Sequence, residues 1–187
     1  MSSAQGSSAR GSSAHPAAPG PYRVVDPHPD IAEALGSLWV AVTEAGGAVD
    51  FVPGDPEDDI RALADSTIAE VRAGRAVMLA LGDGADLAGT VFLVLGSGIA
   101  AHRADVGRLM VRPDLQGRGW GTVLLDAAVA QGTALGLEQL TLGCRGGTPL
   151  PAFYAARGWE QYGVLSQGVR LSADDARDVH LLRRRLT

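Results

Sequence analysis

The chain has 187 residues, 46% of them hydrophobic, and a formal net charge of -5, which suits one compact domain with a buried core. Its apolar runs are far too short to span a bilayer, and its negative charge disfavours a nucleic-acid phosphate partner while mildly favouring a cationic amine. Its one cysteine, Cys144, excludes an internal disulfide framework, so a soluble protein of the reducing cytoplasm is expected.

The N-terminal stretch consists almost wholly of Ser, Ala, Gly and Pro, which bury too little apolar surface to order themselves. We expect residues 1–21 to form a disordered tail and residues 22–187 to form the domain. A first strand is predicted over residues 22–26, followed by a helix that Asp30 caps and that runs to about Thr43. A second helix then carries one apolar stripe, Ile60, Leu63, Ile68 and Val71, and ends at Gly74.

Two strand-like runs follow, residues 76–81 and 87–95, and the turn Gly82-Asp83-Gly84 between them predicts a hairpin. Residues 105–111 are the next predicted strand. A helix over residues 119–135 and a buried strand over residues 137–142 complete a strand-helix-strand unit, which indicates parallel pairing.

The C-terminal part is predicted to contain a short helix over residues 148–157, stopped by Gly158, and two final strands over residues 159–165 and 178–184. The expected fold is therefore mixed α/β, a twisted mixed sheet of about seven strands flanked by about four helices.

The most informative segment joins the strand at residues 105–111 to the following helix through Arg-Pro-Asp-Leu-Gln-Gly-Arg-Gly-Trp-Gly. Glycines 117, 119 and 121 let the main chain approach a ligand, and the first amides of the helix carry partial positive charge. A pyrophosphate would fit such a cradle. The segment is no P-loop, because no Gly-Lys-Ser/Thr follows, and it fits a dinucleotide fingerprint poorly.

The spacing Gln116-x-x-Gly119-x-Gly121, after Leu-Met-Val-Arg-Pro, resembles the acetyl-CoA signature of the GCN5-related N-acetyltransferase (GNAT) superfamily. A second stretch, Phe153-Tyr154-Ala-Ala-Arg-Gly-Trp159, is similar to the Phe-Tyr-x-x-x-Gly-Phe segment near the C-terminus of that family. The two stretches have the family's order and separation, and the resemblance spans about residues 22–187. Within the family, residues 102–111 are most similar to tabtoxin-resistance-type and actinobacterial enzymes that modify small amines.

The resemblance implies acetyl-CoA as cosubstrate. The backbone of one strand would bind the pantetheine arm and face the thioester oxygen, while backbone amides of the glycine-rich segment would hold the pyrophosphate. Arg118 would add charge-assisted contacts, although it equally fits a solvated loop charge. Leu109, Met110 and Val111 of that strand could also simply be residues of the hydrophobic core. The implied cofactor-binding residues are Leu109, Met110, Val111, Gln116, Gly117, Arg118, Gly119, Trp120, Gly121 and Thr122.

Two catalytic residues are implied by the same resemblance. Tyr154 matches the family's tyrosine near the coenzyme sulfur, and a phenol with a pKa near 10 stays protonated and can protonate the departing thiolate. Asp105 lies eleven residues before Gln116, where some relatives carry a glutamate base. Tyr154 also fits a half-buried core tyrosine, and Asp105 an ion-pair partner of Arg103 or Arg108. His102 or water are alternative bases.

One position departs from the family pattern, because Gly147 stands where an asparagine often precedes the tyrosine by seven residues. The four histidines lack metal-ligand spacing, so no metal is expected. The acceptor pocket is expected to be lined by the first two helices, the segment after Gly46 and a loop over residues 166–175.

The predicted function is acetyl transfer to a primary amine of a small molecule, such as an antibiotic or toxin, with no nucleic-acid or membrane partner. Alternatives are a protein lysine or N-terminal acetyltransferase and a non-catalytic acyl-CoA sensor. A homodimer is expected by analogy with relatives.

Overall fold

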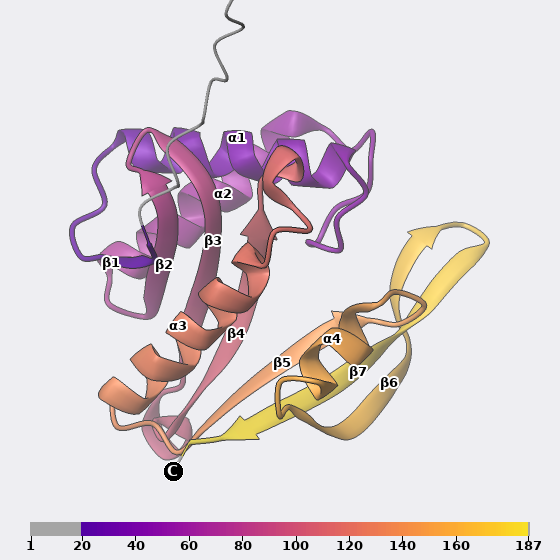
Figure 1. Ribbon diagram of the computed structural model, residues 1–187. Helices are drawn as coiled ribbons and strands as arrows, with labels where there is room; N and C mark the ends of the chain where they lie inside the picture. The colour runs from indigo at the N-terminus through magenta and orange to yellow at the C-terminus, as the bar shows by residue number, and fades with distance from the viewer. Residues whose placement is uncertain (1–19, 187) are drawn as a thin grey trace, which may run out of the picture.

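A computed structural model describes residues 20–186 of the chain. Within those residues it contains seven strands and four α-helices (Figure 1). The strands are β1 (Tyr22–Val24), β2 (Ala76–Asp83), β3 (Asp86–Leu95), β4 (Arg103–Val111), β5 (Gln139–Arg145), β6 (Glu160–Ser172) and β7 (Asp175–Arg185). The helices are α1 (Asp30–Glu44), α2 (Glu57–Arg72), α3 (Trp120–Ala134) and α4 (Leu150–Ala155). The predicted fold class is therefore confirmed, whereas the predicted tail falls almost entirely on residues 1–19, outside the described residues.

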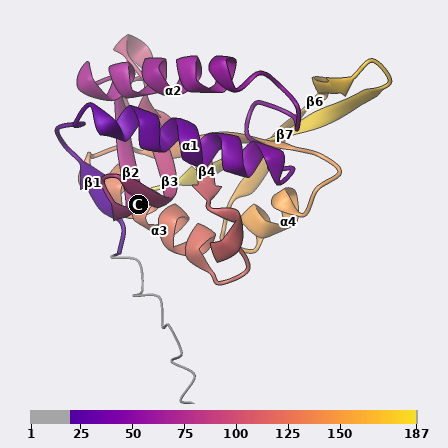
Figure 2. The same cartoon turned by 90° about the horizontal axis from the view of Figure 1, so that it is seen from above.

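Helices cover both faces of the sheet (Figures 1 and 2). On one face α1 and α2 bury Trp39, Phe92 and Met110 against the first strands. On the other face α3 buries Leu124 and Leu125 in a second cluster, to which α4 contributes Tyr154. Burial of two separate apolar clusters, one on each face, supplies the main stabilisation of such a layered domain.

The sheet has the order β1-β2-β3-β4-β5-β7-β6. As predicted, β4 and β5 run parallel, but they pair only where residues 103–105 meet residues 139–141. Beyond this point β4 stays paired with β3, while β5 pairs with β7, and the two halves of the sheet splay apart (Figure 1). The splay leaves one edge of each strand unpaired in the middle of the sheet.

The structure corrects the predicted C-terminal loop. Residues 166–175 were expected to form a loop beside the acceptor pocket, but β6 continues to Ser172 and β7 begins at Asp175. A bulge accommodates the polar and glycine residues, since Gln167 has a φ of 51° and its amide donates to Asp178 Oδ1 at 2.8 Å. The long hairpin projects away from the domain (Figure 1).

Two local predictions need smaller corrections. Asp30 does not cap α1: Pro29 holds the capping position without a side-chain hydrogen bond, and Asp30 lies in the first turn, where its charge favours the positive helix end. The strand before the glycine segment begins at Arg103 rather than at Asp105, because pairing with β3 extends further.

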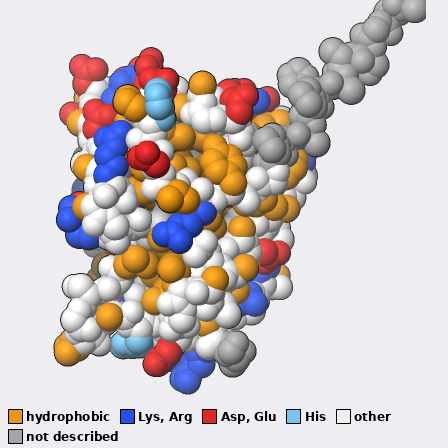
Figure 3. All heavy atoms as spheres, turned by 90° about the vertical axis from the view of Figure 1, so that its left-hand side faces the viewer, with side chains coloured by type: hydrophobic (Ala, Val, Ile, Leu, Met, Phe, Trp, Pro, Cys, Tyr) orange, Lys and Arg blue, Asp and Glu red, His pale blue; other side chains and the backbone are white. Residues whose placement is uncertain are grey.

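The surface charge and the length of the helices are relevant to nucleic-acid and membrane partners. On the face seen in Figure 3, acidic and basic side chains are interspersed, and no continuous basic surface is visible there. Within residues 20–186, no helix combines the length and the apolar character needed to cross a bilayer.

Candidate active site

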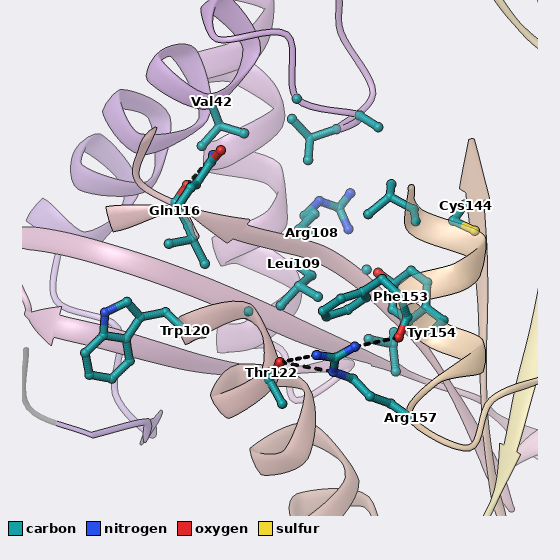
Figure 4. A pocket seen from close by; sticks show the side chains of 18 of the residues that line it. Val42, Arg108, Leu109, Gln116, Trp120, Thr122, Cys144, Phe153, Tyr154 and Arg157 are labelled. Carbon is teal, nitrogen blue, oxygen red and sulfur yellow. Dashed lines mark hydrogen bonds between the residues drawn. The ribbon is translucent and has the colours of Figure 1, made fainter. Parts of the chain in front are cut away.

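A cavity of about 690 Å³ opens where β4 and β5 diverge (Figure 4). Its walls come from the end of α1, the α1–α2 loop, β4, the glycine-rich segment with the first turn of α3, β5 and α4. These elements are far apart in sequence. The splay of the sheet therefore brings both motifs that the sequence singled out to one site.

The glycine-rich segment forms one end of this cavity. Gly117 and Gly119 have φ values of 73° and 85°, in the left-handed region that glycine adopts without strain. Within the described chain, the amides of residues 117–119 donate no hydrogen bond, and Gly119 caps α3 with no side chain over the helix end. Exposed amides at a helix N-terminus form an anion site, so this end suits a phosphate group.

Arg157 connects the second motif to this helix end. Its Nε and Nη2 donate to Thr122 Oγ1 at 3.0 and 2.8 Å, and its Nη1 donates to the Phe153 carbonyl at 2.8 Å (Figure 4). The guanidinium carbon also lies 3.9 Å from the centre of the Phe153 ring. Arg157 therefore places a fixed positive charge beside the first turn of α3.

Tyr154 lies in the wall of the cavity with only 7% of its surface exposed. Its ring packs edge-on against Phe153 and Trp159, with centroid distances of 5.1 and 5.9 Å. Burial, with a smaller effect of Cys144, raises the pKa of Tyr154 above its ordinary value. The phenol is therefore protonated throughout the neutral range, as a hydrogen-bond or proton donor must be.

Cys144 lines the same cavity but is a poor nucleophile. Burial raises the pKa of its thiol to about 11, so the reactive thiolate is scarce at neutral pH. Cys144 therefore has the character of a small buried hydrophobic residue.

A bulge shapes β4 at the cavity. Thr90 pairs with Met110 and Phe92 pairs with Gly107, so that Arg108 and Leu109 together face a single residue of β3. Arg108 has a φ of 51°, and Thr90 Oγ1 donates to its carbonyl at 3.2 Å. A bulge re-aims side chains and frees backbone groups, here on the unpaired edge of β4.

The candidate bases lie elsewhere. The Asp105 carboxylate accepts hydrogen bonds from the Thr141 hydroxyl and from Arg103, the latter at 3.3 Å, and Asp105 does not line the cavity. The predicted ion pair of Asp105 with Arg103 is therefore present. His102 is exposed in the turn before β4 and is likewise outside the cavity wall.

Most residues expected at the coenzyme site line this one cavity. Two do not: Met110 is buried under α1 and α2, and Arg118 is exposed outside the wall. Gln116 lines the cavity but uses its side-chain amide to donate to the Val111 carbonyl at 2.9 Å, which anchors the segment. The residues that do line the cavity are Leu109, Val111, Gln116, Gly117, Gly119, Trp120, Gly121, Thr122 and Tyr154.

Sequence reasoning gave no role to Phe153 and Arg157 and considered Arg108 only as an ion-pair partner of Asp105, a pair that is absent within residues 20–186; all three line the cavity. The second motif contained Phe153 and Arg157, and the strand before the glycine segment contained Arg108. Of the segments expected around an acceptor, residues 47–50 line this cavity, whereas α2 and residues 166–175 contribute nothing to it. Within residues 20–186, no three His, Cys, Asp or Glu side chains cluster so as to hold a metal ion.

A family model described as "Acetyltransferase (GNAT) family" matches residues 39–159, which include the cavity and both motifs. The chain belongs to the GNAT acetyltransferase family. No curated protein matches its sequence.

Solved structures share the GNAT fold. A protein assigned to this family from Desulfovibrio desulfuricans is 19% identical, with a TM-score of 0.69 over 90% of this chain and 100% of its own. A ribosomal L7/L12 α-N-protein acetyltransferase in complex with coenzyme A is 20% identical, with a TM-score of 0.67 over 83% and 88% of the two chains. A protein assigned as a phosphinothricin N-acetyltransferase is 19% identical, with a TM-score of 0.69 over 90% and 99%.

Proposed function

We propose that this GNAT protein transfers an acetyl group from acetyl-CoA directly to a primary amine of a small molecule. The observation that carries the proposal is the single cavity at the splay of β4 and β5, with an amide cradle at one end and the protonated Tyr154 in its wall. Direct transfer needs donor and acceptor side by side in one site, and one cavity that contains both features supports that arrangement.

The donor is proposed to bind through the backbone. The amides of residues 117–119 and of the first turn of α3 would hold its pyrophosphate, and Arg157 would add positive charge there. The unpaired edge of β4 at Leu109 and Val111 would bind the pantetheine arm, in the manner of an added strand. Support also comes from the structural relative in complex with coenzyme A.

In the proposed reaction, the amine nitrogen bonds to the acetyl carbon while the carbon–sulfur bond breaks. Backbone amides at the Arg108 bulge would stabilise the charge that develops on the acetyl oxygen. Tyr154 would give its proton to the departing thiolate and would regain a proton from water. Since neither Asp105 nor His102 lines the cavity, we propose that the amine loses its proton to water, with Asp105 as the competing candidate base.

The acceptor end favours a small molecule over an extended peptide. The loop after α1 is held over this end, because Trp39 Nε1 donates to the Val49 carbonyl at 2.8 Å and Phe51 packs edge-on against Trp39 at 6.1 Å. A wall that is pinned in this way leaves less room for an open groove. Acetylation of a protein N-terminus remains the second candidate, because several structural relatives are ribosomal-protein acetyltransferases.

The cytoplasmic location and the homodimer stay predictions. The dimer proposal is supported by Tyr162, Val164 and Leu165 of the projecting hairpin, which are 51%, 47% and 55% exposed. Light scattering at several protein concentrations tests it.

The experiment that tests the function supplies acetyl-CoA with a panel of small amines, aminated antibiotics and peptides, and follows free thiol. The chain contains no lysine, so acetylation of its own lysine side chains cannot add to the background. Release with a small amine supports the proposal, and release with peptides alone supports the protein-modifying alternative. Tight acetyl-CoA binding without turnover would favour the sensor.

A further inference from the structure

The large cavity carries three charged residues in its wall, namely Asp50, Arg108 and Arg157. Arg157 is already bound to Thr122 and Phe153 at the helix end. Arg108 lies on the opposite side, between the end of α1 and the Phe153–Tyr154 pair (Figure 4). A protein with an overall charge of -5 thus has two cations and one anion around its active cavity.

The backbone fixes where the Arg108 side chain goes. Its positive φ and the Thr90 hydrogen bond to its carbonyl hold the β4 bulge, which turns the side chain toward the α1–α2 face. There the guanidinium carbon lies 5.3 Å from the centre of the Trp39 ring. Trp39 is fully buried and hydrogen-bonded to Val49, so it is a rigid platform for the guanidinium plane.

Arg108 nevertheless lacks a polar partner within residues 20–186. Its Nε is buried with no hydrogen bond, and the side chain forms no ion pair there. A half-buried cation without a hydrogen bond or ion pair to the protein is costly, and an anionic ligand in the cavity would offset that cost.

Nearby carboxylates do not fill this role. Glu70, which borders a smaller hollow that Arg108 also lines, is held by Arg75 at 2.6 and 2.8 Å, and Arg75 lowers its pKa. Asp105 is held by Arg103 and Thr141. Asp50 lines the large cavity without an ion pair to Arg108.

We infer that Arg108 binds a carboxylate of the acceptor, so that the substrate is a small amino carboxylate, a molecule with a primary amine and a carboxylate. The inference rests on the proposed function. A guanidinium presents paired donors that match a planar carboxylate, and the two Nη groups of Arg108, which donate no hydrogen bond within residues 20–186, would supply them. Because Arg108 sits beside the backbone proposed for the thioester, it would position the acceptor for attack.

The kinetic test compares matched amines with wild-type protein, Arg108→Met and Arg108→Lys. The probes are the standard α-amino acids and short ω-amino acids, each beside its carboxamide, with coenzyme A release as readout. We expect wild type to prefer the carboxylate by about 10- to 100-fold in kcat/KM, the size of one charge-assisted pair. Arg108→Met should abolish this preference, and Arg108→Lys should retain part of it.

A binding test uses the same probes with protein saturated with coenzyme A, by calorimetry. The matched control is Arg61→Met, because Arg61 is a partly exposed residue of α2 that does not line the cavity. It should leave the carboxylate preference unchanged.

The outcomes separate the two proposals. Failure of acetyl-CoA to bind would overturn the proposed function itself. If acetyl-CoA binds normally, two results would overturn the Arg108 inference. Either carboxylates show no advantage over carboxamides in either test, or their advantage survives Arg108→Met.

Discussion

Arg157 reaches from the end of the Phe-Tyr segment to Thr122 in the first turn of α3, where two of its nitrogens share one hydroxyl oxygen at 3.0 and 2.8 Å. Arg184 in turn donates to the carbonyl of Arg157. The two sequence motifs are thereby joined by side-chain hydrogen bonds across the cavity. The proposed pyrophosphate site and the proposed acid Tyr154 keep a fixed relation because of this connection.

Removing this connection should weaken coenzyme binding. We expect Arg157→Met and Thr122→Val each to raise the Kd for coenzyme A by about 10- to 100-fold, because a charged donor beside the phosphate site is lost or released. The Kd of the double variant for coenzyme A should exceed that of Arg157→Met by no more than about threefold, because the two residues act together. Calorimetric titration measures this, with Arg170→Met on the projecting hairpin as control. Additive losses would contradict the shared role.

Any side chain at Gly119 should destabilise the left-handed backbone there. We expect Gly119→Ala to cost about 1–2 kcal/mol of unfolding free energy and to weaken coenzyme A binding, because its φ of 85° is strained for alanine. Gly84→Ala is the matched control: it lies in the β2–β3 turn with open space around it and no positive φ. Urea unfolding and calorimetry check both effects, and equal behaviour of the two variants would refute the cradle geometry.

Tyr154→Phe tests the proposed acid. The phenol hydroxyl makes no hydrogen bond to residues 20–186, so stability and coenzyme A affinity should change little. The kcat should fall by about 100-fold or more, as expected when a positioned acid is lost. Tyr162→Phe, on the exposed part of β6, should have wild-type kcat. An unchanged kcat in Tyr154→Phe would remove its assigned role.

Asp105→Asn tests whether water or the Asp105 carboxylate takes the proton of the amine. Because the Asp105 side chain is engaged by Thr141 and Arg103 outside the cavity, we expect kcat/KM to change by less than about threefold at every pH. A loss of about 100-fold, together with loss of the acidic limb of the pH profile, would instead establish Asp105 as the base.

Stability at alkaline pH should report on Cys144. Its folded pKa of about 11 exceeds the unfolded value near 8.5, so the neutral thiol is favoured by folding. This contribution is complete below the unfolded pKa and is lost as pH rises toward the folded pKa. Tyr154 acts in the same direction from about pH 10. Lysine is absent and arginine stays charged, so cysteine and tyrosine dominate this range.

We therefore expect the urea midpoint of wild type to fall more steeply than that of Cys144→Ala between about pH 8.5 and pH 10.5. The slopes are compared rather than the midpoints themselves, because the substitution also removes packing. Parallel profiles would show that burial does not raise the thiol pKa.

The separate elements around the cavity could largely be predicted from local sequence, whereas their meeting at one site was implied only by the resemblance to the GNAT family. The strand, glycine turn and helix around Gly119 and the Phe-Tyr helix with Tyr154 follow from periodicity and turn chemistry, and their parallel connection follows from chain topology. The placement of β7 between β5 and β6 could not be predicted, because pairing of distant strands depends on tertiary contacts. The extension of β6 past Leu165 was missed because Ser166, Gln167 and Gly168 favour a loop, which the bulge absorbs.

The role of Arg108 was also beyond sequence reasoning. Its neighbours predict a regular strand, in which its side chain would simply alternate with those of Gly107 and Leu109. The bulge changes this alternation and brings the guanidinium over Trp39, a residue nearly seventy positions earlier in the chain. Only the packed structure shows that the donor is left without a partner.

The most direct test of acetyl transfer is a single-turnover experiment with protein in excess over acetyl-CoA carrying a labelled acetyl group, quenched rapidly in the presence of the whole panel of small amines, with and without a carboxylate. Direct transfer predicts that the label moves from coenzyme A to the amine at the rate of thiol release, with no labelled protein at any time. Bound acetyl-CoA that transfers its label to no amine would contradict the proposed function, and label appearing first on Cys144 would contradict direct transfer.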